Sequence, residues 1–431
     1  MKPSSKIVHL TSKPPTSRRV FWSVIVGNVL DHYDSALYAF LAPFLAPIFF
    51  PESDPLVALI MIYGLKSLSM ITRPFGSILF GHLALRYPTK TLLVITLTGV
   101  AICTLLIGII PGYETIGILA PISLAVIRAI QGIFAAGEHN IAALFILEHV
   151  KNKKKHSIAS SYYLCSTMSG TMLASLAATI VSQTTDPTYY WRIAFIIGIF
   201  TCLVGIYLRI KTDYNEKLTT KIIPKSSFKL ILENKLTLIK IIPISSFTFV
   251  TYIVPFIFLN NFIPLFGKIT TSELLVHNTI LLVVDIIMLP IFGFIAAKFD
   301  IAKWMATMSC LLAVSIIPSF YILPSLSIIG VTMVKMWIIT LGIAFVAPLN
   351  ALLFRMIPGR EKYLVTGFGY AIGTELLGRS TTPICLGLWY FTDNVMAPAA
   401  YIAFVAICAT FALLCEINNS TERAKKVLQH R

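Results

Sequence analysis

The sequence predicts an all-α membrane protein with twelve transmembrane helices arranged in two six-helix bundles. Its composition is the first indication, because 56% of the 431 residues are apolar and only 13% are charged, whereas about 25% are charged in soluble domains. Apolar runs of about 20 residues, the length that crosses a bilayer as a helix, also follow one another almost end to end. Finally, basic residues gather in alternate loops, as in multi-pass membrane proteins.

The apolar runs place the spans at 21–50, 57–82, 91–110, 119–147, 158–182, 190–210, 241–267, 273–297, 303–323, 326–349, 363–388 and 395–416. We therefore expect a leader at 1–20, an N-terminal bundle at 21–210, a loop at 211–240, a C-terminal bundle at 241–416 and a tail at 417–431. The similar segments GHLALRY (81–87) and GFIAAKF (293–299) end the second and eighth spans, which favours two duplicated halves. Because the leader is polar and the first apolar run has full helix length, we expect no cleavable signal peptide.

The basic residues that give the net charge of +16 are distributed as membrane topology predicts. Lys and Arg concentrate in the leader, after the fourth span, between the sixth and seventh spans, and in the tail. The intervening loops contain almost none, with Lys268 as an exception. By the positive-inside rule, both termini lie in the cytoplasm, as expected for a protein of the bacterial inner membrane. The bilayer, and not nucleic acid, is therefore the expected partner, and we expect a monomer.

Enzyme chemistry has little support in the sequence. The seven cysteines lie within apolar spans and lack the close spacing of metal or disulfide frameworks. No glycine-rich phosphate loop follows a strand, and the loops between spans are too short for a catalytic domain. We expect no enzymatic activity, cofactor or metal.

Charged residues inside the spans are the main functional signal. Each one costs about 2.5–3.5 kcal/mol at the centre of a helix, so it needs a partner, a wet cavity or a function. The first span has Asn28, Asp31 and Asp34 on one face, and the fourth has Arg128, Gln131 and Glu138. An arginine keeps its charge while a neighbouring carboxylate titrates, which suits proton coupling. The alternative is a set of inert ion pairs that hold the bundle together.

The second half adds further candidates. Glu375 and Arg379 are four residues apart and can neutralise each other along one helix. Asp285 lies deep in the eighth span without a partner on its own helix, so it faces a cavity or pairs with another helix. Lys335 is isolated and has no assigned role. The expected substrate-binding residues are Asn28, Tyr38, Gln131, Asp285, Glu375 and Arg379.

Four spans carry motifs that together resemble those of the metabolite:proton symporter branch of the major facilitator superfamily, which includes proline/betaine and dicarboxylate transporters. The matching residues are Gly27, Asn28, Asp31, Asp34 and Tyr38 in the first span; Arg73, Pro74, Gly76, Phe80 and Gly81 in the second; Arg128, Gln131, Gly132, Gly137 and Glu138 in the fourth; and GRSTTP, 378–383, in the eleventh. Ala136 replaces one family glycine, and Asp31 stands where the family usually has Glu.

The resemblance implies the major facilitator fold and a secondary transporter that moves a small polar metabolite with protons. It implies proton-coupling roles for Asp31, Asp34 and Glu138, with Arg128 as the fixed cation that tunes them or meets a substrate carboxylate. A zwitterion such as proline or betaine and a dicarboxylate both suit this arrangement.

The loop after the second span departs from the superfamily pattern, in which an Asp, a base and Gly-Arg form a charge relay. Leu85 stands at the Asp position, and Pro88 and Thr89 replace the Gly-Arg pair. The second-half copy is changed too, with Ala297 and Asp300 at its Asp and Gly positions. Either other contacts replace the relay, or transport is slow, or the chain has become a ligand-binding transceptor or scaffold.

Overall fold

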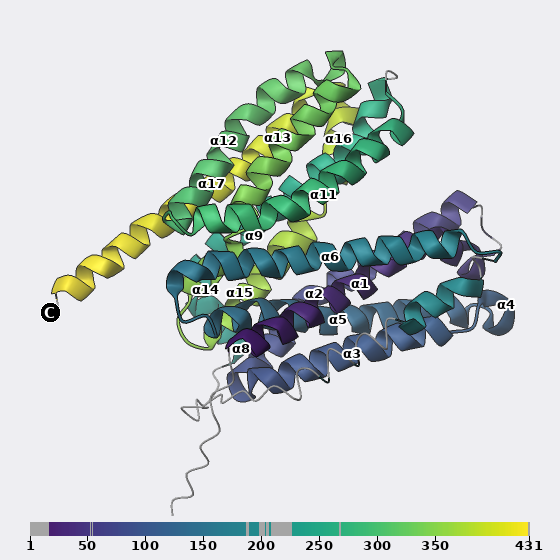
Figure 1. Ribbon diagram of the computed structural model, residues 1–431, viewed down its shortest axis with the longest axis horizontal. Coiled ribbons are helices and arrows are strands. Elements are labelled where there is room, and N and C mark those ends of the chain that lie inside the picture. Colours follow the sequence, from purple (N-terminus) through teal and green to yellow (C-terminus); the bar gives the residue numbers. More distant parts are fainter. Residues whose placement is uncertain are drawn as a thin grey trace, which may run out of the picture.

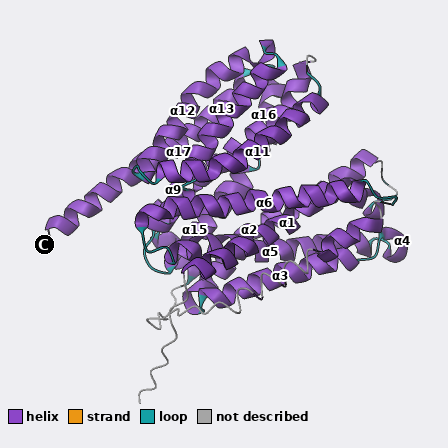
Figure 2. Ribbon diagram, viewed as in Figure 1, coloured by secondary structure: helices purple, strands orange, loops and turns teal. Residues whose placement is uncertain are grey.

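The computed structural model describes residues 17–51, 53, 55–186, 189–197, 203, 207, 226–266 and 269–429. These residues form two helical bundles that lie side by side (Figure 1), and short loops connect helices within each bundle (Figure 2). Most of the predicted leader, residues 208–225 of the sixth span and central loop, and the last two residues of the tail lie outside the described residues.

The N-terminal bundle contains α1 (Ser17–Phe49), α2 (Pro55–Arg86), α3 (Thr89–Ile109), the short α4 (Tyr113–Ile116), α5 (Leu119–Glu148) and α6 (His156–Ser182). A 3₁₀ turn, Lys153–Lys155, leads into α6. Helix α5 packs against α2 and α3, and α1 packs against α6. The first and fourth spans therefore share neighbours near the centre of this bundle.

The C-terminal bundle contains α8 (Ser227–Glu233), α9 (Lys235–Ile253), α10 (Leu259–Phe262), α11 (Thr271–Ala296), α12 (Ile301–Ile322), α13 (Ile328–Val346), α14 (Leu349–Met356), α15 (Glu361–Ala371), α16 (Thr381–Thr392) and α17 (Met396–Gln429). Two π-helical segments, Val254–Phe258 and Ile372–Gly378, and two 3₁₀ turns, Ile263–Phe266 and Leu323–Ser325, interrupt it. Helix α9 begins inside the predicted loop, and α17 continues through the predicted start of the tail.

Eight helical stretches among the described residues are long and apolar enough to cross a membrane. Helices α1 and α2 and the interrupted α15–α16 segment occupy three further predicted spans. The remaining prediction, 190–210, falls partly outside the described residues. Many apolar side chains stay exposed on the outer surface, such as Val314, Met333 and Phe404, as expected where the surrounding solvent is lipid.

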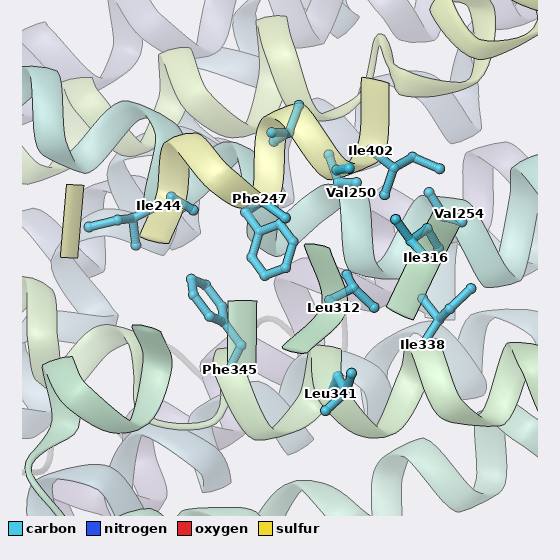
Figure 3. Close-up of a cluster of buried hydrophobic side chains, with 14 of the residues drawn as sticks. Ile244, Phe247, Val250, Val254, Leu312, Ile316, Ile338, Leu341, Phe345 and Ile402 are labelled. Carbon is cyan, nitrogen blue, oxygen red and sulfur yellow. The ribbon is translucent and has the colours of Figure 1, made fainter. Parts of the chain in front are cut away.

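The core of the C-terminal bundle forms where α9, α12, α13 and α17 meet (Figure 3). The rings of Phe247 and Phe345 pack edge to face with centroids 4.7 Å apart. Ile244, Leu312 and Ile338 are fully buried beside them. This packed core makes the bundle a unit that can move as one body.

The two bundles meet at the end where α1 begins, which we call the terminal end, and diverge toward the other end (Figure 1). Here α2 contacts α15, and α6 contacts α11. A Cβ atom added at Gly81 would lie 2.6 Å from Leu364 Cα, and one added at Gly293 would lie 2.1 Å from Ser161 Oγ. The two glycines of the internal repeat thus allow close approach at corresponding interbundle contacts.

Arg360 fastens the terminal end at the place where the family charge relay is changed. Its guanidinium donates to Ala84 O at 2.7 Å, Tyr87 O at 2.8 Å and Thr89 Oγ1 at 3.2 Å. The carbonyl groups at the end of a helix lack partners within the helix and attract cations. Arg360 of one bundle therefore caps the end of α2 in the other.

Two further contacts support this closure. Lys362 Nζ pairs with Glu148 Oε1 at 2.8 Å, and Arg355 Nη2 donates to Lys153 O at 2.8 Å. Both join residues at or near the ends of helices in opposite bundles. Contacts that do not use the missing Asp of the relay thus hold the terminal end closed.

We predict that Arg360→Ala loosens this closure, because it removes three hydrogen bonds to the other bundle. A cysteine placed at buried Ser161, with the seven native cysteines replaced, should react with maleimide roughly tenfold faster in the Arg360→Ala variant, since a hydrogen bond to a charged group contributes about 1.5–3 kcal/mol. Arg86→Ala removes a nearby exposed arginine and is the control. Equal labelling rates in the two variants would contradict a closing role for Arg360.

Candidate functional site

A chain of hydrogen bonds connects the predicted cation to one predicted acid. Arg128 Nη1 donates to Gln131 Oε1 at 2.6 Å, Gln131 Nε2 donates to Thr104 Oγ1 at 3.0 Å, and Thr104 donates to Asp34 Oδ2 at 2.9 Å. All four residues are at most 5% exposed. A hydroxyl group on α3 therefore connects the polar face of α1 to that of α5 by hydrogen bonds.

Tyr38 positions the arginine from the other side. The guanidinium carbon of Arg128 lies 3.9 Å from the centre of the Tyr38 ring, a distance at which the face of the ring stabilises the cation. The Tyr38 hydroxyl donates to Ile62 O at 3.1 Å and so ties the ring to α2. Two residues of the predicted site, one on the first span and one on the fourth, thus hold the buried charge of Arg128.

Asp31 lies at a small cavity between α1, α2, α3 and α5. Arg73, Arg128, Gln131 and Ser35 also line this cavity. The structure therefore brings Asp31, Arg128 and Gln131 together, as the sequence predicts, and adds Arg73 from the second span.

Arg73 connects this cavity to the C-terminal bundle. Its Nη1 lies 2.9 Å from Glu375 Oε1, and the other oxygen of Glu375 lies 2.8 Å from Arg379 Nε. The second contact has the distance of an ion pair without the alignment of a hydrogen bond. The predicted pairing of Glu375 with Arg379 is thus present, but the carboxylate is shared with an arginine of the other bundle.

Glu375 lies in the π-helical segment Ile372–Gly378. Such segments are rare and occur frequently at functional sites. Only 3% of its side chain is exposed, against 20% for Arg73 and 26% for Arg379. The acid is therefore covered, while its two cations remain partly accessible.

Aromatic rings line the boundary between the bundles beside these charges. His139 of α5 stacks on Tyr370 of α15 with centroids 5.0 Å apart, and His32 of α1 lies 5.9 Å from His139. His32 Nδ1 is 3.7 Å from Asp31 Oδ2. These rings link Asp31 to the C-terminal bundle by a second route.

The structure separates Glu138 from this group. Thr96 Oγ1 donates to Glu138 Oε2 at 2.8 Å, and the carboxylate is fully buried. Ten residues separate Glu138 from Arg128, which corresponds to about 15 Å along a helix. The polar face of α5 therefore contacts α3 at two separate positions, Thr96 and Thr104.

Another predicted site residue, Asn28, also lies elsewhere. The Asn28 amide donates to Tyr163 O, Ser166 Oγ and Thr167 Oγ1 at 2.7–3.1 Å, which places it in the contact between α1 and α6. Asp285 is buried on α11, between Leu281 and Leu289 of an apolar cluster that also joins α6. Lys335 donates to Asn260 and Asn278 inside the C-terminal bundle at 2.7 and 2.9 Å.

No sequence pattern indicates the roles of Thr104 and Thr96 or the connecting role of Arg73. The threonines stand in an apolar span and look like ordinary helix residues, so their partners give no sequence signal. Arg73 was visible as a charge inside a span, but its partner lies 302 residues away. In the described parts of the chain, no three His, Cys, Asp or Glu side chains are grouped to hold a metal ion.

We predict that Thr104→Val slows uptake of the transported solute about 5- to 30-fold, because it removes the hydroxyl that connects Gln131 to Asp34, a step worth about 1–2 kcal/mol. Thr104→Ser keeps the hydroxyl and should retain most of the activity. Initial uptake rates in proteoliposomes would measure both variants. If the valine and serine variants behave alike, the hydroxyl has no such role.

Curated relatives match most of the chain. It is 27% identical over 415 residues to a proline/betaine transporter of Escherichia coli strain K12, covering 90% of this chain and 81% of that protein. It is 25% identical over 419 residues to the alpha-ketoglutarate permease of the same strain, covering 93% and 94%.

A solved structure of a proton:xylose symporter matches the fold with a TM-score of 0.72 at 15% identity, covering 92% of this chain and 94% of the other. The similarity confirms the predicted fold class of two bundles. The family model of the Major Facilitator Superfamily matches residues 24–383. The chain therefore belongs to the Major Facilitator Superfamily.

Proposed function

We propose that this secondary transporter is a proton symporter for a small polar metabolite that carries a carboxylate, either a proline- or betaine-like zwitterion or a dicarboxylate. The proposed setting is the bacterial inner membrane, with both termini in the cytoplasm. The observation that carries the proposal is the shared carboxylate of Glu375 between Arg73 and Arg379, because it joins the two moving bundles at a site made for a carboxylate.

The geometry around Asp34 suits a group that gains and loses a proton. Thr104 Oγ1 lies 2.9 Å from Asp34 Oδ2 and 3.0 Å from Val100 O. An ionised Asp34 accepts from Thr104, whereas a protonated Asp34 donates to it, and the hydroxyl then donates to Val100 O. Both states keep their hydrogen bonds, so protonation has a low structural cost.

The same hydroxyl connects proton binding to Arg128. Gln131 donates to Thr104 and accepts from Arg128, so a change at Asp34 alters the hydrogen bonds that hold the arginine. Asp31, Arg73 and Arg128 all line the same small cavity. In our proposal, protonation of Asp31 or Asp34 removes a negative charge beside this cavity. The positive charge of the neighbouring arginines is then available to bind the substrate.

Glu375 occupies the position that a substrate carboxylate would take. Arginine binds carboxylates through parallel hydrogen bonds, and Arg73 and Arg379 already surround one. A substrate carboxylate that binds either arginine loosens the link between the bundles. For a zwitterion, the displaced Glu375 and the ring of Tyr370 would face its cationic group.

The alternative is a transceptor or scaffold that binds its ligand without moving it. It was motivated by the changed relay after the second span. Arg360 and Lys362 provide other contacts at that end, which supports a chain that still closes and opens. Ligand binding by calorimetry without counterflow would favour the transceptor.

We predict that Asp34→Asn abolishes uptake driven by a pH gradient but permits counterflow of the same solute, because exchange requires no net proton movement. The assay would use proteoliposomes and a panel of labelled zwitterions and dicarboxylates, with and without a protonophore. The buried Thr96→Ser variant, which keeps its hydroxyl, is a control for folding. Undiminished pH-driven uptake by Asp34→Asn, or by Arg128→Ala, would refute the coupling assignment.

We also predict that Glu375→Gln binds a carboxylate substrate more tightly, by up to roughly fivefold, because substrate no longer displaces an internal carboxylate that contributes up to about 1 kcal/mol between partly exposed partners. The unliganded variant should also unfold at a lower temperature, since two cations lose their partner. Glu148→Gln removes an acid from another interbundle ion pair and is the matched control. Weaker substrate binding by Glu375→Gln would show that Glu375 itself contacts the substrate favourably.

A further inference from the structure

We propose that a groove at the terminal end binds the phosphodiester headgroup of an anionic membrane lipid. The groove has a volume of about 690 Å³ and lies between the two bundles. Its first wall comes from the residues that precede and begin α6, and its second from the end of α11 and from α14. None of the residues that line the groove lines the cavity of the proposed transport site. The basic and aromatic residues that line the groove are Lys153, Lys154, His156, Lys298, Phe299, Phe354 and Arg355.

The charge of the groove favours an anion. Lys153, Lys154, Lys298 and Arg355 are exposed side chains around one opening, and the described lining includes no acid. Asp300 follows nearby in the chain, but its carboxylate accepts from Lys303 N at 3.0 Å and caps α12. The charge of Asp300 also acts on Arg355, so four positive charges stand against one acid. This excess attracts a phosphate group and disfavours a cation.

His156 is a second, independent indication of a ligand. It lines the groove and is only 5% exposed. Its Nε2 lies 2.9 Å from Val150 O, whereas its Nδ1 is buried without a hydrogen-bond partner in the described structure. A buried polar atom without a partner is unfavourable. With Nε2 donating to Val150 O, Nδ1 of the neutral ring is an acceptor, and a hydroxyl group of a lipid headgroup or a bound water can donate to it. The site is therefore more than a patch of flexible surface lysines.

The surroundings identify the anion as part of a lipid. Phe299 lines the groove and is 56% exposed, and Phe294 and Ile291, on the adjoining turns of α11, are each 50% exposed. These exposed apolar side chains place the groove beside the outer, lipid-facing surface of a membrane-spanning helix. A ligand with an anionic head and acyl chains fits both parts, whereas a free phosphate uses only the first. Basic pockets between membrane helices bind anionic headgroups in this way.

The groove also depends on the conformation of the protein. One wall belongs to each bundle, and Arg355 connects them through its hydrogen bond to Lys153 O. A lipid that contacts both walls binds best when the terminal end is closed, so it shifts the population toward the closed state. This consequence rests on the proposed transport cycle, but lipid binding itself does not.

The test measures lipid binding to the full chain in detergent by native mass spectrometry, with phosphatidylglycerol, phosphatidylcholine and glycerophosphate as probes. The test variant is Lys154→Gln/Lys298→Gln, which removes one charge from each wall and leaves Arg355 in place. Lys229→Gln/Lys235→Gln removes two exposed lysines from the start of the C-terminal bundle and is the matched control. Because binding is read directly, the result is independent of whether the chain transports any solute.

We expect phosphatidylglycerol to bind the native protein more tightly than phosphatidylcholine. The Lys154→Gln/Lys298→Gln variant should weaken this binding at least about tenfold, since each lysine near an anionic lipid contributes roughly fivefold, while the control stays within twofold. Equal losses in both double variants would reduce the effect to general surface charge and overturn the proposal. Competition by glycerophosphate as strong as that by the intact lipid would assign the groove to a soluble anion instead.

Discussion

The cost of placing charge inside a membrane is the constraint on which the structure depends. Every ionised side chain near the bilayer centre must find a partner, because lipid offers none. Arg128 meets Gln131 and Tyr38, Lys335 meets two asparagine amides, and Glu375 meets two arginines. The helices are therefore arranged around these few polar contacts, while their outer faces stay apolar.

The interbundle charges differ from the others because motion must break them. Lys335 and its amides lie within one bundle, so rocking leaves them intact. Arg73 and Glu375 lie in different bundles, and their ion pair can persist only while the bundles stay close. A buried pair that loses one partner is strongly unfavourable. An alternative partner is therefore needed in the open state, and a substrate carboxylate or a proton on Glu375 provides one in our proposal.

At the terminal end, other contacts hold the two bundles together although the family motif is changed. Leu85 cannot form the ion pair of the family relay, yet the end of α2 still presents unpaired backbone carbonyls. Arg360 donates to two of them and to Thr89. Close packing at Gly81 and Gly293 brings the bundles within reach of these contacts. The ends of the helices thus supply acceptors that no side-chain motif reveals.

The sequence predicts which site residues lie on one face of a helix, but it does not predict which residues of different helices meet. Asp31, Arg128 and Gln131 were expected to meet because three-residue spacing puts them on single faces, and the cavity between α1 and α5 brings them together. Glu138 lies on the same predicted face of α5, but ten residues of helical rise carry it to Thr96 instead. Asn28 lies on the predicted face and nonetheless contacts α6. A face of a helix is wide enough to touch more than one neighbour, so spacing alone does not choose the partner.

The sequence by itself determined the fold class and the positions of most membrane helices, because a bilayer accepts little except apolar runs of helical length with their backbone bonds satisfied internally. It also identified which charges need an explanation. Only the tertiary structure decided which charges meet, since Arg73 and Glu375 are 302 residues apart and Thr104 gives no sign of its role. Such contacts depend on how whole helices pack and rotate, and that depends on the sum of many weak apolar contacts that no local pattern records.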